Sequence, residues 1–241
     1  GNTDAQYNLG ICYYYGEGIG QDYKQAIGWF ALSAENGDAD AQKRLGDCYY
    51  CGTGVDLDYN LAEYWYRKAA EQGHPDAQLC IGDTYADGKG NDKSAVMAVL
   101  WYKKSAENGN ADAQNRLGDC YYFGYGVEQD KEKAIYWYKK SAEQGNADAQ
   151  WILGSCYLHG DGVEQSYTEA VKWYHLAAEQ GNESAQWILG SCYLHGDGVD
   201  QSYTEATKWF RVAAERGEKN AQFDLGICYE KGVGVEQSYT K

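Results

Sequence analysis

The feature that most constrains this chain is an internal repeat of 36 residues that runs without insertion or deletion. A glycine at positions 1, 37, 73, 109, 145, 181 and 217 opens six full repeats (1–36, 37–72, 73–108, 109–144, 145–180 and 181–216) and a partial seventh (217–241). Alanine at repeat position 5, glutamine at 6, tyrosine at 13, and glycine at 10, 16 and 18 are identical in all seven copies. Such a period is typical of a solenoid, in which each repeat buries its apolar face against its neighbours.

Each repeat predicts two helices joined by a glycine loop. The first helix begins after repeat position 2, where Asn or Asp is a favourable N-cap, and Pro75 follows at a position that tolerates proline. It ends at the glycines of positions 16 and 18, because glycine readily adopts the positive φ angle of a tight exit. The second helix begins at a Ser-Tyr-Thr-Glu sequence (Ser166–Glu169 and Ser202–Glu205), which has the pattern of a capping box.

The helix period also predicts the core. Repeat positions 5, 9, 12, 13 and 16 lie on one side of the first helix. In the first repeat, the second helix contributes Tyr23, Ala26, Trp29, Phe30 and Ala34. A single hairpin cannot bury these residues alone, whereas a stack of hairpins can. The sequence therefore predicts an all-α fold: a single α-solenoid domain of helix-turn-helix repeats over residues 1–241.

One family shares this pattern. The second repeat shows it in the following residues: Leu45, Gly46, Tyr49, Gly52, Gly54, Val55, Ala62, Trp65, Tyr66, Ala69, Ala70 and Gly73. The whole chain resembles the Sel1-like repeat family, which is related to the tetratricopeptide repeats. The resemblance implies a right-handed superhelix whose first helices line a concave face, and a role as an adaptor or scaffold for other proteins.

The same family includes secreted bacterial members that are described as β-lactamase-like. In those members, the resemblance implies a disulfide between cysteines at repeat positions 34 and 6. This chain has alanine at position 34 (Ala34, Ala70) and glutamine at position 6 (Gln42, Gln78), so it departs from that branch.

The eight cysteines favour free thiols. Six of them occupy repeat position 12: Cys12, Cys48, Cys120, Cys156, Cys192 and Cys228. Equivalent residues of adjacent repeats are expected roughly 8–10 Å apart, whereas a disulfide requires Cα atoms within about 7 Å. Unpaired thiols favour a reducing compartment such as the cytoplasm. The chain begins at Gly1 rather than at methionine, so secretion stays open.

Two short motifs imitate catalytic sites. Cys48 and Cys51 have C-x-x-C spacing, but they lie at the end of a predicted helix, where the dipole does not lower a thiol pKa. Cys156, His159 and Asp161 suggest a triad, yet the cysteine falls on the core face and the aspartate lies between loop glycines. We therefore expect no catalytic residue, no metal site and no cofactor.

Charge and hydropathy limit the classes of partner that this chain is expected to bind. The net charge of −15 and the pI near 4.6 argue against nucleic acid, because an acidic surface repels phosphate. The absence of an 18-residue apolar run argues against membrane insertion. We therefore expect a protein or peptide partner.

Positions that vary between otherwise constant repeats are candidates for recognition. Repeat positions 7, 11 and 14 vary and share one face of the first helix, which the helix period places opposite the core. The predicted partner-binding residues are Tyr7, Tyr14, Lys43, Asp47, Tyr50, Asp83, Asp119, Tyr122, Trp151, Leu158, Trp187, Leu194 and Phe223. The aspartates form an acidic row, and the last five residues are apolar. We expect a partner that is basic at one end and apolar at the other, unless these side chains pack within the solenoid.

Two other interpretations remain open. The chain can be a purely structural segment of a longer protein, which we expect from its ends inside the repeat pattern; exposed ends could then promote end-to-end self-association. A β-lactamase-like hydrolase is the least favoured. The third repeat departs most from the pattern, with Thr84, Asn91 and Ala95, which predicts a locally weak joint.

Overall fold

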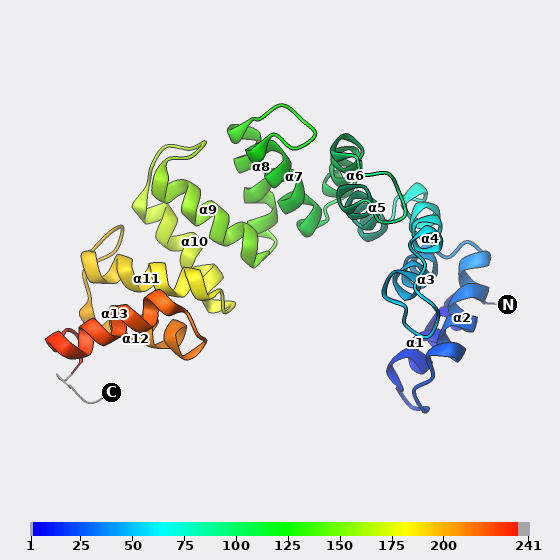
Figure 1. Ribbon diagram of the computed structural model, residues 1–241, viewed down its shortest axis with the longest axis horizontal. Coiled ribbons are helices and arrows are strands. Elements are labelled where there is room, and N and C mark those ends of the chain that lie inside the picture. Colours follow the sequence, from blue (N-terminus) through cyan, green and yellow to red (C-terminus); the bar gives the residue numbers. More distant parts are fainter. Residues whose placement is uncertain (1, 236–241) are drawn as a thin grey trace. The chain divides into compact units, whose positions relative to one another are not determined.

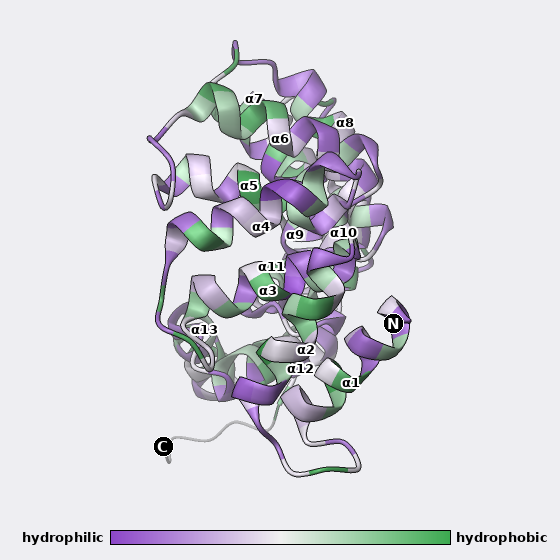
Figure 2. Cartoon of the chain, turned by 90° about the vertical axis from the view of Figure 1, so that its right-hand side faces the viewer, coloured by the Kyte–Doolittle hydropathy of each residue, from purple (hydrophilic) through white to green (hydrophobic). Residues whose placement is uncertain are grey.

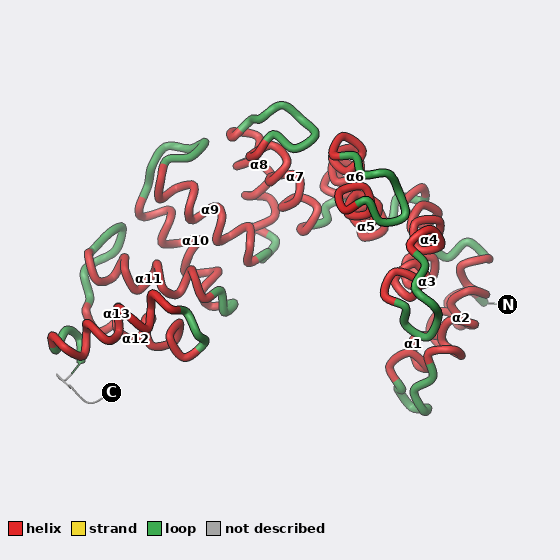
Figure 3. Tube along the Cα trace, in the orientation of Figure 1, coloured by secondary structure: helices red, strands yellow, loops and turns green. Residues whose placement is uncertain are grey.

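The computed structural model describes residues 2–235, and in this range it contains thirteen helices and no strand (Figures 1 and 3). Every helix has thirteen residues. Their bounds are α1 (Thr3–Tyr15), α2 (Tyr23–Glu35), α3 (Ala39–Cys51), α4 (Tyr59–Glu71), α5 (Pro75–Asp87), α6 (Ala95–Glu107), α7 (Ala111–Phe123), α8 (Lys131–Glu143), α9 (Ala147–His159), α10 (Tyr167–Glu179), α11 (Glu183–His195), α12 (Tyr203–Glu215) and α13 (Lys219–Lys231).

The helix ends follow the predicted signals. The side chain of Asn2 caps α1 by accepting a hydrogen bond from the backbone N–H of Ala5, and Gly16 ends the helix with a φ of 77°. Ser166 caps α10 by accepting from the backbone N–H of Glu169. The capping box is only half formed, because the Ser166 N–H donates to the Tyr157 carbonyl instead of to the glutamate side chain.

The helices form two compact units, residues 1–129 with α1–α7 and residues 130–241 with α8–α13. Within each unit, every helix packs against the next one in the sequence. Figure 2 shows hydrophobic and hydrophilic residues on the same helices, as expected where each helix buries one side. The fold is therefore an all-α solenoid of helix pairs, as the sequence predicts.

The observed core corrects part of the predicted one. Ala26, Phe30 and Ala34 are buried as expected. Tyr23, the first residue of α2, is exposed, and Trp29 is only half-buried. The glycine at repeat position 10 is buried instead, as Gly10 shows.

This glycine is where the two helices of a repeat come closest. A Cβ atom added to Gly46 would lie 2.5 Å from the ring of Tyr66, at repeat position 30. Gly82 and Gly190 face the rings of Tyr102 and Phe210 in the same way. The aromatic ring therefore lies directly on the backbone of the first helix.

A buried hydrogen bond joins successive repeats. The side-chain amide of Gln42 donates to the carbonyl of Ala34 over 2.9 Å, and Gln78 donates to Ala70 over 3.1 Å. These are repeat positions 6 and 34, the positions at which the disulfide-bearing branch carries cysteines. Here a hydrogen bond connects them, and all eight cysteines are free thiols.

The third repeat compensates for one of its departures. Thr84 replaces the position-12 cysteine, and Asn91 replaces the valine at position 19. The Asn91 amide donates to the Thr84 hydroxyl over 3.2 Å, and the hydroxyl donates to the Ile81 carbonyl over 2.8 Å. A polar pair therefore replaces an apolar one, and the expected weakness of this joint stays a prediction.

The glycine–ring contact makes a matched pair of substitutions informative. Gly190→Ala should lower the free energy of unfolding by about 1–3 kcal/mol, because the methyl group would overlap the ring of Phe210. Gly226→Ala in α13 should leave stability unchanged or raise it by up to about 1 kcal/mol, because no described residue outside its own helix turn lies within 4 Å of the added Cβ and alanine favours a helix. Urea unfolding followed by circular dichroism measures both, and equal effects would contradict this packing.

Candidate functional site

The predicted partner-binding residues do not point directly away from the core. They are half-buried, except for Phe223, which is 69% exposed. The expectation of a free face opposite the core is therefore wrong, because each first helix also contacts the neighbouring repeats. We call these thirteen residues the first-helix stripe.

In residues 1–129, the acidic row is tied to tyrosine hydroxyls. The Tyr66 hydroxyl donates to Asp47 over 3.0 Å, and the Tyr102 hydroxyl donates to Asp83 over 2.8 Å. Lys43 also forms an ion pair with Asp47, with 2.9 Å between Nζ and Oδ2. Burial raises the pKa of Asp83 above its ordinary value, although the Tyr102 hydroxyl acts in the opposite direction. These two carboxylates therefore serve internal contacts and offer a partner less free charge than the sequence indicated.

The stripe tyrosines pack against second helices. The ring of Tyr7 lies 5.9 Å from that of Phe30, and the ring of Tyr14 lies 5.2 Å from that of Tyr23. Tyr50 accepts a hydrogen bond from Lys89 over 3.0 Å.

Two stripe residues lie on α7. Asp119 is half-buried and lines a cavity described below. Tyr122 stacks edge to face on Phe123, with ring centroids 4.9 Å apart, and its carbonyl accepts from Gln129.

In residues 130–241, the apolar stripe residues pack between repeats. Trp151 and Leu158 lie against the cluster formed by α10 and α11, and Trp187 and Leu194 lie against the cluster formed by α12 and α13. The indole N–H of Trp187 donates to Asp224 of the next repeat over 2.8 Å. The tryptophans are therefore structural contacts as well as candidate anchors, so replacing them by alanine would not test binding alone.

The sequence interpretation missed a second set of exposed side chains, on the second helices. Tyr64 is 46% exposed and stacks edge to face on Trp65, and the ammonium of Lys68 lies over both rings. Tyr136, Trp137 and Lys140 repeat this arrangement on α8. The signal was present in the sequence as Tyr-Trp-x-x-Lys at repeat positions 28, 29 and 32.

The Cys-His-Asp motif is not assembled as a catalytic site. Cys156 is buried, and burial raises the pKa of its thiol to about 11, so the thiol stays protonated at neutral pH. His159 is exposed, and Asp161 forms an ion pair with Lys131 at 2.9 Å. In the second copy, His195 Nδ1 lies 3.0 Å from the carbonyl of Ser191, so this nitrogen is not available as a base.

The Cys48 thiol of the C-x-x-C pair is equally unreactive. Cys48 is buried and Cys51 is exposed, and burial raises the pKa of the Cys48 thiol to about 12. A redox pair needs a thiolate at neutral pH, which this environment disfavours.

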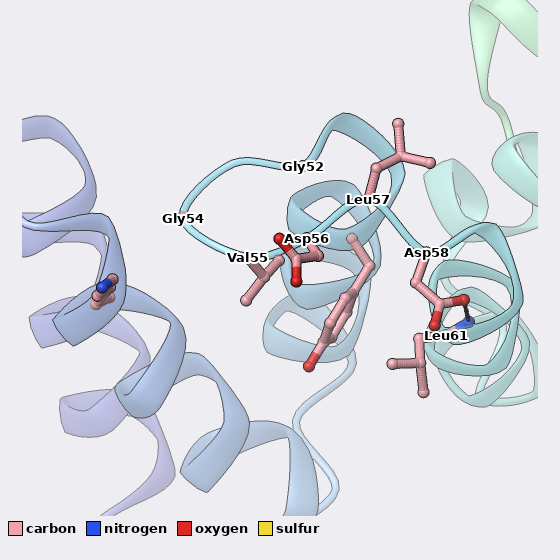
Figure 4. A pocket seen from close by; sticks show the side chains of 9 residues that line it. Gly52, Gly54, Val55, Asp56, Leu57, Asp58 and Leu61 are labelled. Carbon is pink, nitrogen blue, oxygen red and sulfur yellow. Dashed lines mark hydrogen bonds between the residues drawn. The ribbon is translucent and has the colours of Figure 1, made fainter.

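A depression of about 710 Å³ lies over the loop between α3 and α4 (Figure 4). Its lining combines loop and helix-cap residues, among them Gly52, Gly54 and Asp58, with Lys24, Tyr49 and Leu61 of α2, α3 and α4. Asp58 accepts hydrogen bonds from the backbone N–H groups of Asn60 and Leu61, so its carboxylate caps α4. The lining therefore pairs no nucleophile with a base.

Two further cavities lie at equivalent places between repeats. One of about 570 Å³ lies between the third and fourth repeats, and one of about 550 Å³ lies between the sixth and seventh. Within residues 2–235, no group of three or more His, Cys, Asp and Glu side chains could hold a metal ion. No helix in this part of the chain could span a membrane.

Because of the tyrosine–aspartate hydrogen bond, we expect substitutions at repeat positions 30 and 11 to have strongly coupled effects on the free energy of unfolding. Tyr66→Phe should destabilise by about 1–3 kcal/mol, because Asp47 loses a donor. Asp47→Ile should also destabilise, because it leaves the buried hydroxyl without an acceptor. The double variant copies the Ile11–Phe30 pair of the first repeat, and should cost less than the sum of the single effects by about 0.5–3 kcal/mol. A double-mutant cycle in urea measures this coupling, and additive effects would disprove it.

The two nearly identical tryptophans allow another comparison. Trp187 has an acceptor for its N–H, whereas the indole nitrogen of Trp151 is buried with no hydrogen-bond partner among the described residues. Trp187→Phe should therefore destabilise the protein by about 0.5–1.5 kcal/mol more than Trp151→Phe. Chemical unfolding of both variants tests this, and the reverse order would refute the assignment.

Comparison with known proteins identifies the repeat. The Sel1 repeat model matches residues 3–38, 39–74, 75–110, 111–146, 147–182, 183–218 and 219–241. A search of curated proteins found no match.

Solved structures of similar fold agree with this family match. A protective antigen of uropathogenic Escherichia coli with an SLR fold is 40% identical, with a TM-score of 0.92 over 98% of this chain and 51% of the antigen. This chain therefore spans about half of the antigen's length. A Sel1 repeat protein from Oxalobacter formigenes is 32% identical, with a TM-score of 0.81 over 97% of this chain and 92% of that one. An immunity protein of Pseudomonas aeruginosa shares the fold at 22% identity, with a TM-score of 0.54 over 92% of this chain and 81% of its own.

The 36-residue period and the Sel1 repeat matches cover residues 3–241, and the chain belongs to the Sel1 repeat family.

Proposed function

We propose that this chain is a non-catalytic scaffold that binds a protein or peptide partner on the first-helix stripe. Sel1 repeats form generic scaffolds for protein interactions. The observation that supports the stripe is that its side chains stay partly exposed on successive first helices. Within each compact unit, a solenoid can present such residues as an extended surface.

The residue types of the first-helix stripe favour a partner that makes both apolar and polar contacts. Its tyrosines and tryptophans are residue types that often anchor protein interfaces. Because they are held by internal contacts, such as Tyr50 with Lys89, they lose little conformational freedom when a partner binds. A buried thiol at Cys156 and a capping carboxylate at Asp58 favour a binding role over hydrolysis.

Peptide selection followed by footprinting tests this proposal. The intact chain is used to select binders from a random peptide library, and the best peptide is then added during hydroxyl-radical labelling. We expect protection of Tyr7 and Tyr50 on the stripe of residues 1–129, or of Phe223 on the stripe of residues 130–241, with unchanged labelling of Tyr64 and Tyr136, which are exposed on second helices.

Each other outcome argues against the proposal. Protection of Tyr64 and Tyr136 alone would move binding to the second helices. Failure to select any peptide would favour the purely structural interpretation.

A further inference from the structure

The third repeat lacks an aromatic pair that other repeats carry. In the first repeat, the rings of Tyr14 and Tyr23 pack edge to face at repeat positions 14 and 23, and the second repeat has the same pair at the same 5.2 Å separation. The third repeat has Ala86 and Ala95 there, and it is the only full repeat with a small residue at both positions. Two rings are therefore missing from one place.

A cavity of about 570 Å³ lies at this place, and we call it the third-repeat cavity. Both alanines line it, together with Ala98 and Tyr102, which are 3% and 4% exposed and belong to the core of the repeat. The loss of the rings therefore opens the surface down to core residues.

The sixth repeat provides the comparison. Its equivalent cavity of about 550 Å³ is lined by Leu194 and Tyr203 at positions 14 and 23. Ala206 and Phe210, which correspond to the core residues of the third-repeat cavity, are not part of that lining. Large side chains at positions 14 and 23 thus keep the sixth-repeat cavity away from these two core residues.

The charge of the third-repeat cavity differs from that of the whole chain. Its lining contains two basic residues, Lys93 and Arg116, and one acidic residue, Asp119, whereas the chain carries a net charge of −15. Arg116 already forms an ion pair with Asp83, with 3.8 Å between Nε and Oδ1. Lys93 occupies the repeat position of Gln21, whose side-chain amide donates a hydrogen bond to the carbonyl of Tyr14 in the first repeat. Lys93 forms no hydrogen bond or ion pair with the described residues, so its ammonium group is available to an anion.

The rim of the cavity is aromatic. Phe123 and Tyr125 also line it, stack with centroids 5.4 Å apart, and are 54% and 60% exposed. An exposed aromatic pair next to an apolar cavity is typical of an interaction site.

We propose that the third-repeat cavity binds one aromatic side chain of a partner peptide, next to an acidic residue of that peptide. The inference rests on the proposed scaffold function and specifies its anchor point. The aromatic ring fills the place of the missing tyrosines against Tyr102, and the acidic group pairs with Lys93. A rigid aromatic group in a preformed apolar pocket is an efficient anchor.

Three capped peptides test the chemistry: Gly-Asp-Trp-Asp-Gly, Gly-Asp-Ala-Asp-Gly and Gly-Lys-Trp-Lys-Gly. Dissociation constants come from NMR titration of the intact chain. The first peptide should bind at least about tenfold more tightly than the second, because the ring supplies the anchor. It should also bind more tightly than the third. Lys93→Gln should weaken the first peptide by about two- to fivefold, as expected for an exposed ion pair. Equal binding of all three peptides would overturn the proposal.

A filled cavity provides the matched control. Ala86→Tyr with Ala95→Tyr copies the first repeat, and Ala86→Leu with Ala95→Tyr copies the sixth. Each double variant should abolish binding of the tryptophan peptide and raise Tm by about 2–4 °C, since it fills a void. Loss of binding with higher Tm excludes unfolding as its cause. Unchanged binding in a variant with raised Tm would overturn the proposal.

The library peptides separate this inference from the scaffold function. If library peptides bind the wild-type chain and the filled variants equally, the third-repeat cavity is not the anchor, and the scaffold function stands. If the wild-type chain retains no library peptide and no tryptophan peptide, both proposals fail.

Discussion

The rest of the structure depends on the contact between the glycine at repeat position 10 and the aromatic ring at position 30. At Gly46, a single added carbon would overlap the ring of Tyr66, so the two helices of a repeat approach as closely as backbone and ring allow. This approach sets where the ring hydroxyl lies, and therefore which residue of the first helix can accept its hydrogen bond. In the second repeat that acceptor is Asp47. The packing within a repeat thus helps to determine which residue occupies a variable position of the first helix.

Much of the fold could be predicted from the sequence because its signals are local. The N-caps, the positive-φ glycines and the period of 36 residues each act over a few positions, and the helices begin and end where they indicate. The core was harder to predict, because the helix period alone does not tell a buried glycine from an exposed one. Gly10 is buried because the ring of Phe30 lies against its backbone, whereas Tyr23 is exposed at the start of α2.

The candidate site could be predicted only as a set of positions. The sequence shows that positions 7, 11 and 14 vary together on one face, but not that neighbouring repeats cover that face. The bond from Trp187 to Asp224 depends on the stagger between two repeats, which no pattern within one repeat contains. Variation at position 11 follows the residue at position 30 in several repeats: Ile11 accompanies Phe30, whereas Asp47 accompanies Tyr66. Variable positions in a solenoid can therefore reflect internal pairing as well as recognition.

This distinction separates two kinds of change within the third repeat. Thr84 and Asn91 depart from the consensus together and bond to each other, so the chain itself compensates for the change. Ala86 and Ala95 also depart together, but no side chain among residues 2–235 fills the volume that they leave, and a cavity remains beside the exposed rings of Phe123 and Tyr125. A paired substitution that is compensated internally serves the fold. A paired substitution that leaves an apolar cavity reduces the packing of the repeat without an internal gain, and a binding partner supplies the missing contact.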